Sequence, residues 1–303
     1  MNVKRTLGAI ALLAIAQPVL ASPASAGDAK MAAEAVAAVH ADMEATLGRV
    51  PAFFIGYPPA ALPGAWQAFK ALQLSTTTAL SGKEKELIGL AVASQIPCRY
   101  CIYAHTASAR ANGASDAEAA EAVAMAGLTR HWSTVLNGSL ADEAEFRAWA
   151  DAAFAYAGAK GATAQRVAVV DADSAMRDAA ALLGTPPPFL AAYPAAAVPG
   201  AWQELEAMQM SGDTALPSRV KELIGLAVAA QIPCRYCSYA HTKPARLNGA
   251  TDQQVQEALG MAALTRQWST WLHGMQADEA TFRADFDAIL AGTPAAEAAP
   301  KSR

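Results

Sequence analysis

Two nearly identical stretches decide the fold of this chain: Lys85–Cys101, KELIGLAVASQIPCRYC, and Lys221–Cys237, KELIGLAVAAQIPCRYC. In the first, residues 87–93 are apolar without interruption, which is typical of a helix buried on all sides. The proline that follows suits the first turn of a new helix, so the pattern predicts a second helix that begins at the cysteines. Alanine is abundant and alternating β-branched runs are absent, which indicates an all-α protein.

The two stretches belong to a repeat that covers most of the chain. Residues 51–150 align with residues 187–286 without a gap, and 62 of the 100 pairs are identical. The period of 136 positions is the size of a small domain. The sequence therefore predicts two homologous helical domains in tandem, the first over residues 27–160 and the second over residues 161–292.

The four cysteines of the chain all lie in these repeats, and each pair is followed by a histidine. Residues i, i+3 and i+7 of a helix fall within roughly 60° of one another, so each set shares one helix face. A cysteine at a helix start is stabilised as a thiolate, and a histidine one turn on can accept or return its proton. The sets are Cys98, Cys101 and His105, and Cys234, Cys237 and His241.

One acid recurs inside each apolar helix. Glu86 and Glu222 lie twelve positions before the first cysteine of their copy. A carboxylate among apolar side chains is costly unless it has a partner. Each glutamate is interpreted as a buried proton acceptor near the histidine, and the alternative is a salt bridge at the helix end with Lys85 or Lys221. Glu84 faces a valine in the other copy and is expected to be solvated.

The remaining histidines differ between the copies. His131 faces Gln267, and His273 faces Asn137. Because neither is repeated, we expect both histidines at surface or core positions, as for His40, which faces Met176.

Three kinds of site are compatible with the thiol motif. It can be a redox dithiol. It can be a zinc site in which Cys98, Cys101, His105 and Glu86 are the ligands, although structural zinc sites usually draw ligands from separate elements. It can also be a structural clip in a helical binding or assembly module.

The ends of the chain differ in composition from the repeats. Residues 1–26 combine Lys4 and Arg5 with an apolar run over Thr6 to Leu20 and the sequence Ala24-Ser25-Ala26, which is typical of a cleaved secretory signal. We expect an exported protein, periplasmic or secreted, without stable membrane insertion after cleavage. Residues 293–303 are expected to be a disordered tail. The net charge of −4, without a long basic cluster, argues against nucleic acid as a partner.

The pattern Glu-x11-Cys-x2-Cys-x3-His on helical domains resembles the alkyl hydroperoxidase D-like, carboxymuconolactone decarboxylase superfamily. The resemblance implies thiol–disulfide reductase activity of the peroxiredoxin type, with a peroxide or disulfide substrate, a thiol electron donor and no cofactor. It also implies a proton relay from glutamate through histidine to the dithiol, and assembly of three duplicated chains into a ring of six similar units. The decarboxylase branch lacks the cysteine pair, so its activity is not expected. The implied catalytic residues are Glu86, Cys98, Cys101, His105, Glu222, Cys234, Cys237 and His241.

Overall fold

The computed structural model describes residues 26–160 and 163–292, which form helices and contain no β-strand. The prediction of an all-α protein is confirmed for this part of the chain. The expected signal segment up to residue 25 and the expected tail from residue 293 lie outside the described residues. No helix in the described ranges is long and apolar enough to cross a membrane.

The helices follow one another in the same order in both repeats. The first repeat contains α1 (Ala26–Leu47), α2 (Ala52–Ile55), α3 (Leu62–Phe69), the π-helix η1 (Lys70–Leu74), α4 (Gly82–Gln95), α5 (Arg99–Ala111), α6 (Asp116–Gly138) and α7 (Glu143–Lys160). The second contains α8 (Ala172–Leu183), η3 (Pro188–Leu190), η4 (Ala195–Ala197), α9 (Val198–Leu205), the π-helix η5 (Glu206–Met210), α10 (Ser218–Gln231), α11 (Arg235–Leu247), α12 (Asp252–Gly274) and α13 (Glu279–Gly292).

Local sequence signals set several helix boundaries. Ser115 and Thr251 each accept a hydrogen bond from the backbone N–H three residues on, and the side chain at that position returns one, so both long helices α6 and α12 begin with a capping box. The cysteine helices begin directly after Cys98 and Cys234, as predicted.

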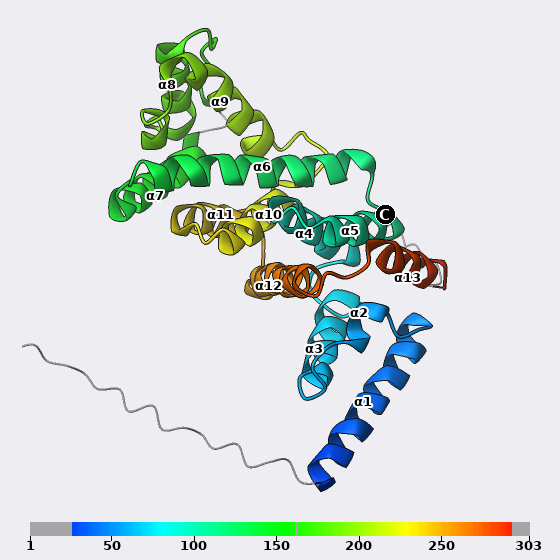
Figure 1. Cartoon of the computed structure of the whole chain (residues 1–303). Helices are drawn as coiled ribbons and strands as arrows, with labels where there is room; N and C mark the ends of the chain where they lie inside the picture. The colour runs from blue at the N-terminus through cyan, green and yellow to red at the C-terminus, as the bar shows by residue number, and fades with distance from the viewer. Residues whose placement is uncertain (1–25, 161–162, 293–303) are drawn as a thin grey trace, which may run out of the picture.

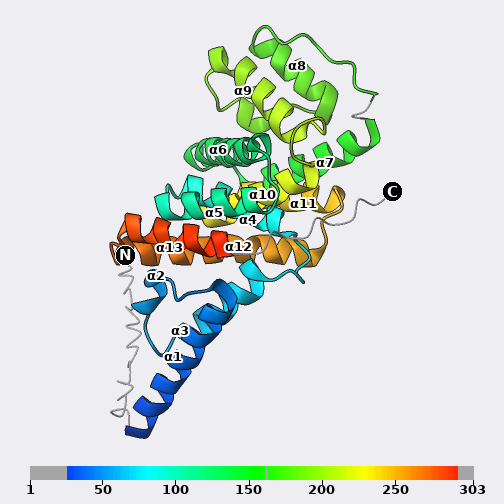
Figure 2. The same cartoon turned by 90° about the vertical axis from the view of Figure 1, so that its right-hand side faces the viewer.

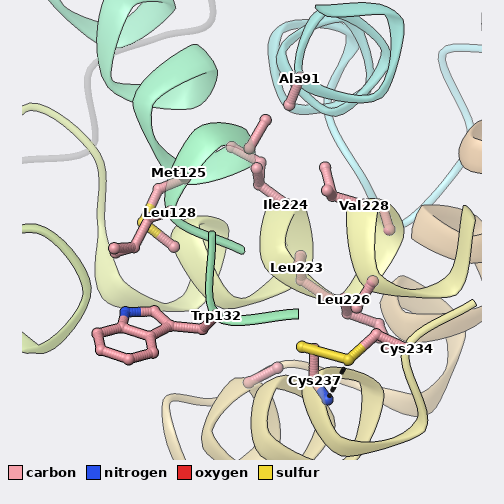
Figure 3. Close-up of a cluster of buried hydrophobic side chains, with 14 of the residues drawn as sticks. Ala91, Met125, Leu128, Trp132, Leu223, Ile224, Leu226, Val228, Cys234 and Cys237 are labelled. Atoms are coloured by element: carbon pink, nitrogen blue, oxygen red, sulfur yellow. Dashed lines mark hydrogen bonds between the residues drawn. A yellow bond between two sulfur atoms is a disulfide. The ribbon is translucent and has the colours of Figure 1, made fainter. Parts of the chain in front are cut away.

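The helices form layers around α4 and α10. In Figures 1 and 2, a middle layer of α4, α5, α10 and α11 lies between α6 on one side and α12 on the other. Helices α4 and α10 pack against each other, and each also contacts both α6 and α12. Every residue from Lys85 to Ala93 is buried, which agrees with the apolar pattern of α4. Figure 3 shows Ala91 of α4, Met125 of α6 and Ile224 of α10 close together. All three belong to one continuous cluster of buried apolar side chains.

The two repeats interlock. Helix α6 of the first repeat lies on α10 of the second, and α12 of the second lies on α4 of the first. Two buried glutamates mark these crossings. Glu257 of α12 accepts backbone N–H bonds from Ala79 and Leu80, at 2.9 and 2.7 Å. Glu121 of α6 accepts the equivalent bonds from the loop before α10. The predicted domains are therefore repeats in sequence that share one core in space.

One expectation about a surface residue is wrong. Glu84 is not solvated, because its side chain is only 13% exposed and forms an ion pair with Arg219 of the second repeat. The N-terminal ends of α4 and α10 thus meet across the repeats. Sequence comparison could not show this partner, since Arg219 lies in the other copy.

Cutting the chain between the repeats should leave the two halves associated, because α6 and α12 each pack on the core of the other half. A protease site inserted after Gln165, which is exposed, allows the cut. Size-exclusion chromatography under native conditions should show both fragments in one peak at the elution volume of the uncut protein. Separate elution of folded fragments would contradict the shared core.

Candidate active sites at two dithiols

Each dithiol occupies the first turn of its helix. Cys98 is the N-cap of α5, and its sulfur accepts a hydrogen bond from the backbone N–H of Cys101 at 3.3 Å. The two sulfurs lie 2.7 Å apart. In the second site the same bond runs from Cys237 to Cys234 at 3.2 Å, and these two cysteines form a disulfide, drawn in Figure 3. Both pairs therefore hold their two sulfurs side by side at the start of a helix.

The two thiols of the first site differ in acidity. The hydrogen bond with the Cys101 thiol, followed by those with Ser269, the Cys101 N–H and His273, lowers the pKa of Cys98 to about 5, although burial opposes the shift. The hydrogen bond with Cys98 and burial raise the pKa of Cys101. Cys98 is therefore the more acidic thiol of the pair.

A histidine and a glutamate form a buried pair in each site. Nδ1 of His105 lies 2.6 Å from Oε2 of Glu86, and both side chains are only 6% exposed. His241 and Glu222 repeat the contact at 2.7 Å. The carboxylate accepts the Nδ1 proton, so Nε2 is left as a proton acceptor. The structure thus brings together the glutamate and histidine that the sequence analysis expected to be neighbours.

The alternative of a salt bridge between Glu86 and Lys85 does not hold. Lys85 is fully buried, and its Nζ donates to the carbonyl oxygens of Leu72 and Ser75 at 2.9 and 2.5 Å. Burial lowers the pKa of Lys85, while the carboxylates of Glu86 and Glu257 act in the opposite direction. The lysine thus fixes the loop before α4, and Glu86 faces the histidine.

A glutamine in each π-helix completes the pair, and sequence reasoning missed it. Nε2 of Gln73 donates to Oε1 of Glu86 at 3.2 Å, and Gln209 donates to Glu222 at the same distance. π-Helices are rare and occur often at functional sites. The sequence does show that each glutamine lies at the same distance before its glutamate in both repeats. This does not single out the glutamines, because many other residues are also identical in the two repeats.

Each site also takes residues from the other repeat. Thr265 of α12 places its hydroxyl 3.3 Å from Nε2 of His105, and Thr129 of α6 does the same for His241. Ser269 and His273 of α12 interact with Cys98. His273 is exposed, as expected for a histidine that the repeats do not share. Helix α12 also brings its imidazole against Tyr100 beside the first cysteine pair, with ring centroids 5.1 Å apart, which a comparison of the repeats alone could not show.

A glycine makes room for each histidine. A methyl group at Gly89 of α4 would overlap the imidazole ring of His105, and one at Gly225 of α10 would overlap that of His241. Glycine inside a helix costs about 1 kcal/mol relative to alanine. The close approach of the ring to the helix backbone explains why both apolar helices contain one.

The second site borders a cavity of about 490 Å³. Cys237, His241 and Glu222 line one part of it. Most of the remaining wall is apolar, and Trp132 of α6 and Phe146 of α7 contribute to it. A ligand in this cavity would place an apolar body against the first repeat and a reactive group at the cysteine and histidine.

The zinc alternative gains no support from the geometry. Within residues 26–160 and 163–292, no three or more His, Cys, Asp or Glu side chains are arranged to hold a metal ion. Glu86 is directed at Nδ1 of His105 rather than at a position shared with the two sulfurs.

The fold and the sites define a tandem all-helical protein with two buried Cys-x-x-Cys pairs, each in a site with a histidine–glutamate pair. The sequence model of the carboxymuconolactone decarboxylase family matches residues 60–144 and 196–280, together more than half of the chain. The chain belongs to this family, in agreement with the resemblance seen in the sequence.

Relatives add little about function. "Uncharacterized protein 4 in cox locus" of Paracoccus denitrificans is 42% identical over 65 residues, which are 22% of this chain and 59% of that protein. The match thus spans about three fifths of the relative's length. No solved structure matches the chain.

Replacing Gly89 with alanine should displace His105 and destabilise the protein by about 1–3 kcal/mol, the usual cost of overpacking a core. Gly127 of α6 is the matched control, because it is an exposed helical glycine with open space around it. Gly127→Ala should stabilise by up to about 1 kcal/mol. Urea unfolding of both variants measures the difference. Equal stabilisation by both substitutions would show that the ring does not need the glycine.

Proposed function

We propose that this protein is a thiol–disulfide oxidoreductase of the peroxiredoxin-linked type, with a redox dithiol in each repeat. The observation that carries the proposal is the repeated combination of a Cys-x-x-Cys pair at a helix start with a buried glutamate–histidine pair beside it. The lowered pKa of Cys98 supports a redox role for the pair, because a thiol of low pKa is the better leaving group when a donor thiol opens the disulfide at the second cysteine.

The reaction follows from the arrangement of the second site. Cys237 and His241 border the same cavity, so a substrate there meets both. Nε2 of His241 accepts the thiol proton of Cys237, and the Cys237 sulfur attacks one sulfur of a disulfide substrate. The other substrate sulfur leaves and takes that proton. Cys234 then attacks the mixed disulfide, which forms the Cys234–Cys237 bond and releases the second substrate thiol.

The same groups can reduce a peroxide. The Cys237 sulfur attacks one oxygen, the O–O bond breaks, and the alcohol leaves with the proton that the histidine holds. The resulting sulfenic acid condenses with the Cys234 thiol to form the disulfide and water. In both cases the substrate gains two electrons and the dithiol loses two, so a thiol donor must reduce the disulfide again. The apolar wall of the cavity favours a substrate with an apolar body.

The pair of Glu86 and His105 has the role of proton acceptor in the first site, so Glu86→Gln should slow the chemical step. The test uses the full chain with Cys234→Ser and Cys237→Ser, which leaves only the first dithiol. After chemical reduction, a small aromatic disulfide is added and thiol release is followed in a stopped-flow instrument. One disulfide should be consumed per dithiol, and Glu86→Gln should reduce the rate by about 10²-fold, the usual scale for a positioned proton-transfer group.

Glu84→Gln is the matched control, because Glu84 lies on the same helix but pairs with Arg219. It should leave the rate unchanged. Normal turnover in Glu86→Gln together with early unfolding would mean that Glu86 is a structural residue. Failure of the reduced parent protein to consume the disulfide or an organic hydroperoxide would overturn the proposed function.

We further propose that the protein is exported and that three chains assemble into a ring of six similar units. Membership of a family that often forms oligomers supports assembly. Val123 on α6 and Leu259 on α12 are exposed apolar side chains at equivalent positions, and they serve to probe the contact. Light scattering at micromolar concentration should give the mass of three chains, and Val123→Glu with Leu259→Glu should lower it. A monomeric mass of the unaltered protein would refute the ring, and N-terminal sequencing of protein from its native source checks the export.

A further inference from the structure

The surroundings of the two first cysteines, Cys98 and Cys234, are closely matched. Arg99 beside Cys98 is paired with Glu279 of α13 at 2.9 Å, and Arg235 beside Cys234 is paired with Glu143 of α7 at 3.2 Å. The charged groups next to the cysteines therefore balance in the same way in both sites.

The neighbouring tyrosines are matched as well. Tyr100 donates its hydroxyl to the carbonyl oxygen of Ala277 at 2.6 Å, and Tyr236 donates to that of Ala141 at 2.5 Å. A serine is present at the equivalent position of both crossing helices, Ser269 on α12 and Ser133 on α6, and both serines are buried.

One position in this set differs. His273, one turn after Ser269, packs its imidazole edge-on against Tyr100 with ring centroids 5.1 Å apart, and it interacts with Cys98. Its counterpart in the second site is Asn137. The amide of Asn137 is turned along its own helix, where it donates to the carbonyl oxygen and the hydroxyl of Ser133 at 2.7 and 3.3 Å.

We propose that His273 makes the two dithiols unequal, so that the first is more easily reduced than the second and the two sites work at different redox conditions. In the reduced state the imidazole, which packs against Tyr100 two residues after Cys98, lowers the pKa of Cys98 and so stabilises its thiolate. This stabilisation is lost when the sulfur joins the disulfide. A group that stabilises only the reduced form makes a dithiol more oxidising, as the stabilised reduced form of strongly oxidising thiol proteins illustrates. His273 is thus a positioning residue for the first site, and the inference rests on the proposed dithiol chemistry.

An unequal pair has a consequence for an oxidising compartment. The first dithiol would stay reduced under conditions in which the second is already oxidised. Because two-electron exchange between thiol pairs depends on their difference in potential, the second dithiol is the better reductant and the first the better oxidant. One chain would then cover a wider range of redox conditions than two identical sites could.

The test is a redox titration of the full chain in glutathione buffers from pH 4 to pH 8. Exchange is stopped with acid, free thiols are alkylated after unfolding, and mass spectrometry of peptides reports each dithiol separately. At pH 7 the equilibrium constant for reduction by glutathione should be at least about tenfold larger for the first dithiol, which corresponds to about 30 mV.

The pH profile separates an electrostatic role of His273 from a structural one. Below the pKa of Cys98, about 5, reduction of the first disulfide releases no net proton, so its equilibrium constant is independent of pH. Above it one proton is released per disulfide, and the constant rises tenfold per pH unit. Removal of a donor to the thiolate moves the beginning of this rise to higher pH. The titrating and charged groups that surround Cys98 are Cys101, Tyr100, Arg99, Glu279 and His273. All of them except His273 have counterparts in the second site.

Reciprocal substitutions complete the experiment. His273→Asn should bring the first dithiol to the value of the second and move the rise upward by about one pH unit, and His273→Ala should do the same. Asn137→His should make the second dithiol easier to reduce. His131→Gln is the control, since Gln267 already occupies its counterpart position, and it should change neither site.

Two outcomes would overturn the inference: identical titrations of both dithiols in the unaltered protein, or an unchanged profile in His273→Asn and Asn137→His together. A lower melting temperature of His273→Asn would leave its titration open to a structural explanation. Asn137→His then tests the inference, because it adds an imidazole to the second site and removes none from the first. The titration needs no substrate. If the two dithiols titrate differently but the protein consumes neither a disulfide nor a hydroperoxide, the proposed function is refuted and the inference about His273 stands.

Discussion

The structure depends on the burial of two helices that are apolar nearly all round, α4 and α10. A helix of this kind has no face that can be left in water, so it needs neighbours on every side. Each repeat by itself supplies only part of that cover. The rest comes from the partner repeat, because α6 and α12 each contact both apolar helices. The shared core is thus a direct consequence of a sequence that buries a whole helix per repeat.

The burial of these two helices also buries four charged side chains, and each of them needs hydrogen-bond partners. Lys85 and Glu86 are neighbours in α4, and Lys221 and Glu222 repeat them in α10. A buried ion without partners costs several kcal/mol. Successive residues point to different sides of a helix, so each lysine reaches carbonyl oxygens of the preceding loop while each glutamate reaches the histidine and the π-helix glutamine. The glutamates are therefore held by hydrogen bonds beside the cysteine pairs, where the proposed proton transfer would use them.

The interlocked arrangement makes each site depend on both repeats, so the two sites can differ. Thr265 and Thr129 approach the two histidines from the opposite repeat, so every site is a contact between the halves of the chain. If the two repeats were separate identical subunits, a substitution on the helix that reaches the neighbouring site would change both sites at once. Because the repeats are joined in one chain, a substitution on α6 or on α12 changes only one site. His273 and Asn137 lie at such a position, at the end of the crossing helices, where the surrounding charges are otherwise matched.

The sequence by itself determined the helical class, the duplication, the helix starts at the cysteines and the neighbourhood of Glu86 and His105. These features depend on periodicity, capping and short loops, which act within one repeat. Tertiary structure alone decided that Glu84 meets Arg219, that Gln73 supports Glu86, and that Thr265 and His273 belong to the first site. These contacts join residues far apart in the chain or in different repeats, and no local pattern reports them. The physical reason is that burial of α4 and α10 selects the partner helix, and the partner then carries its own side chains into the site.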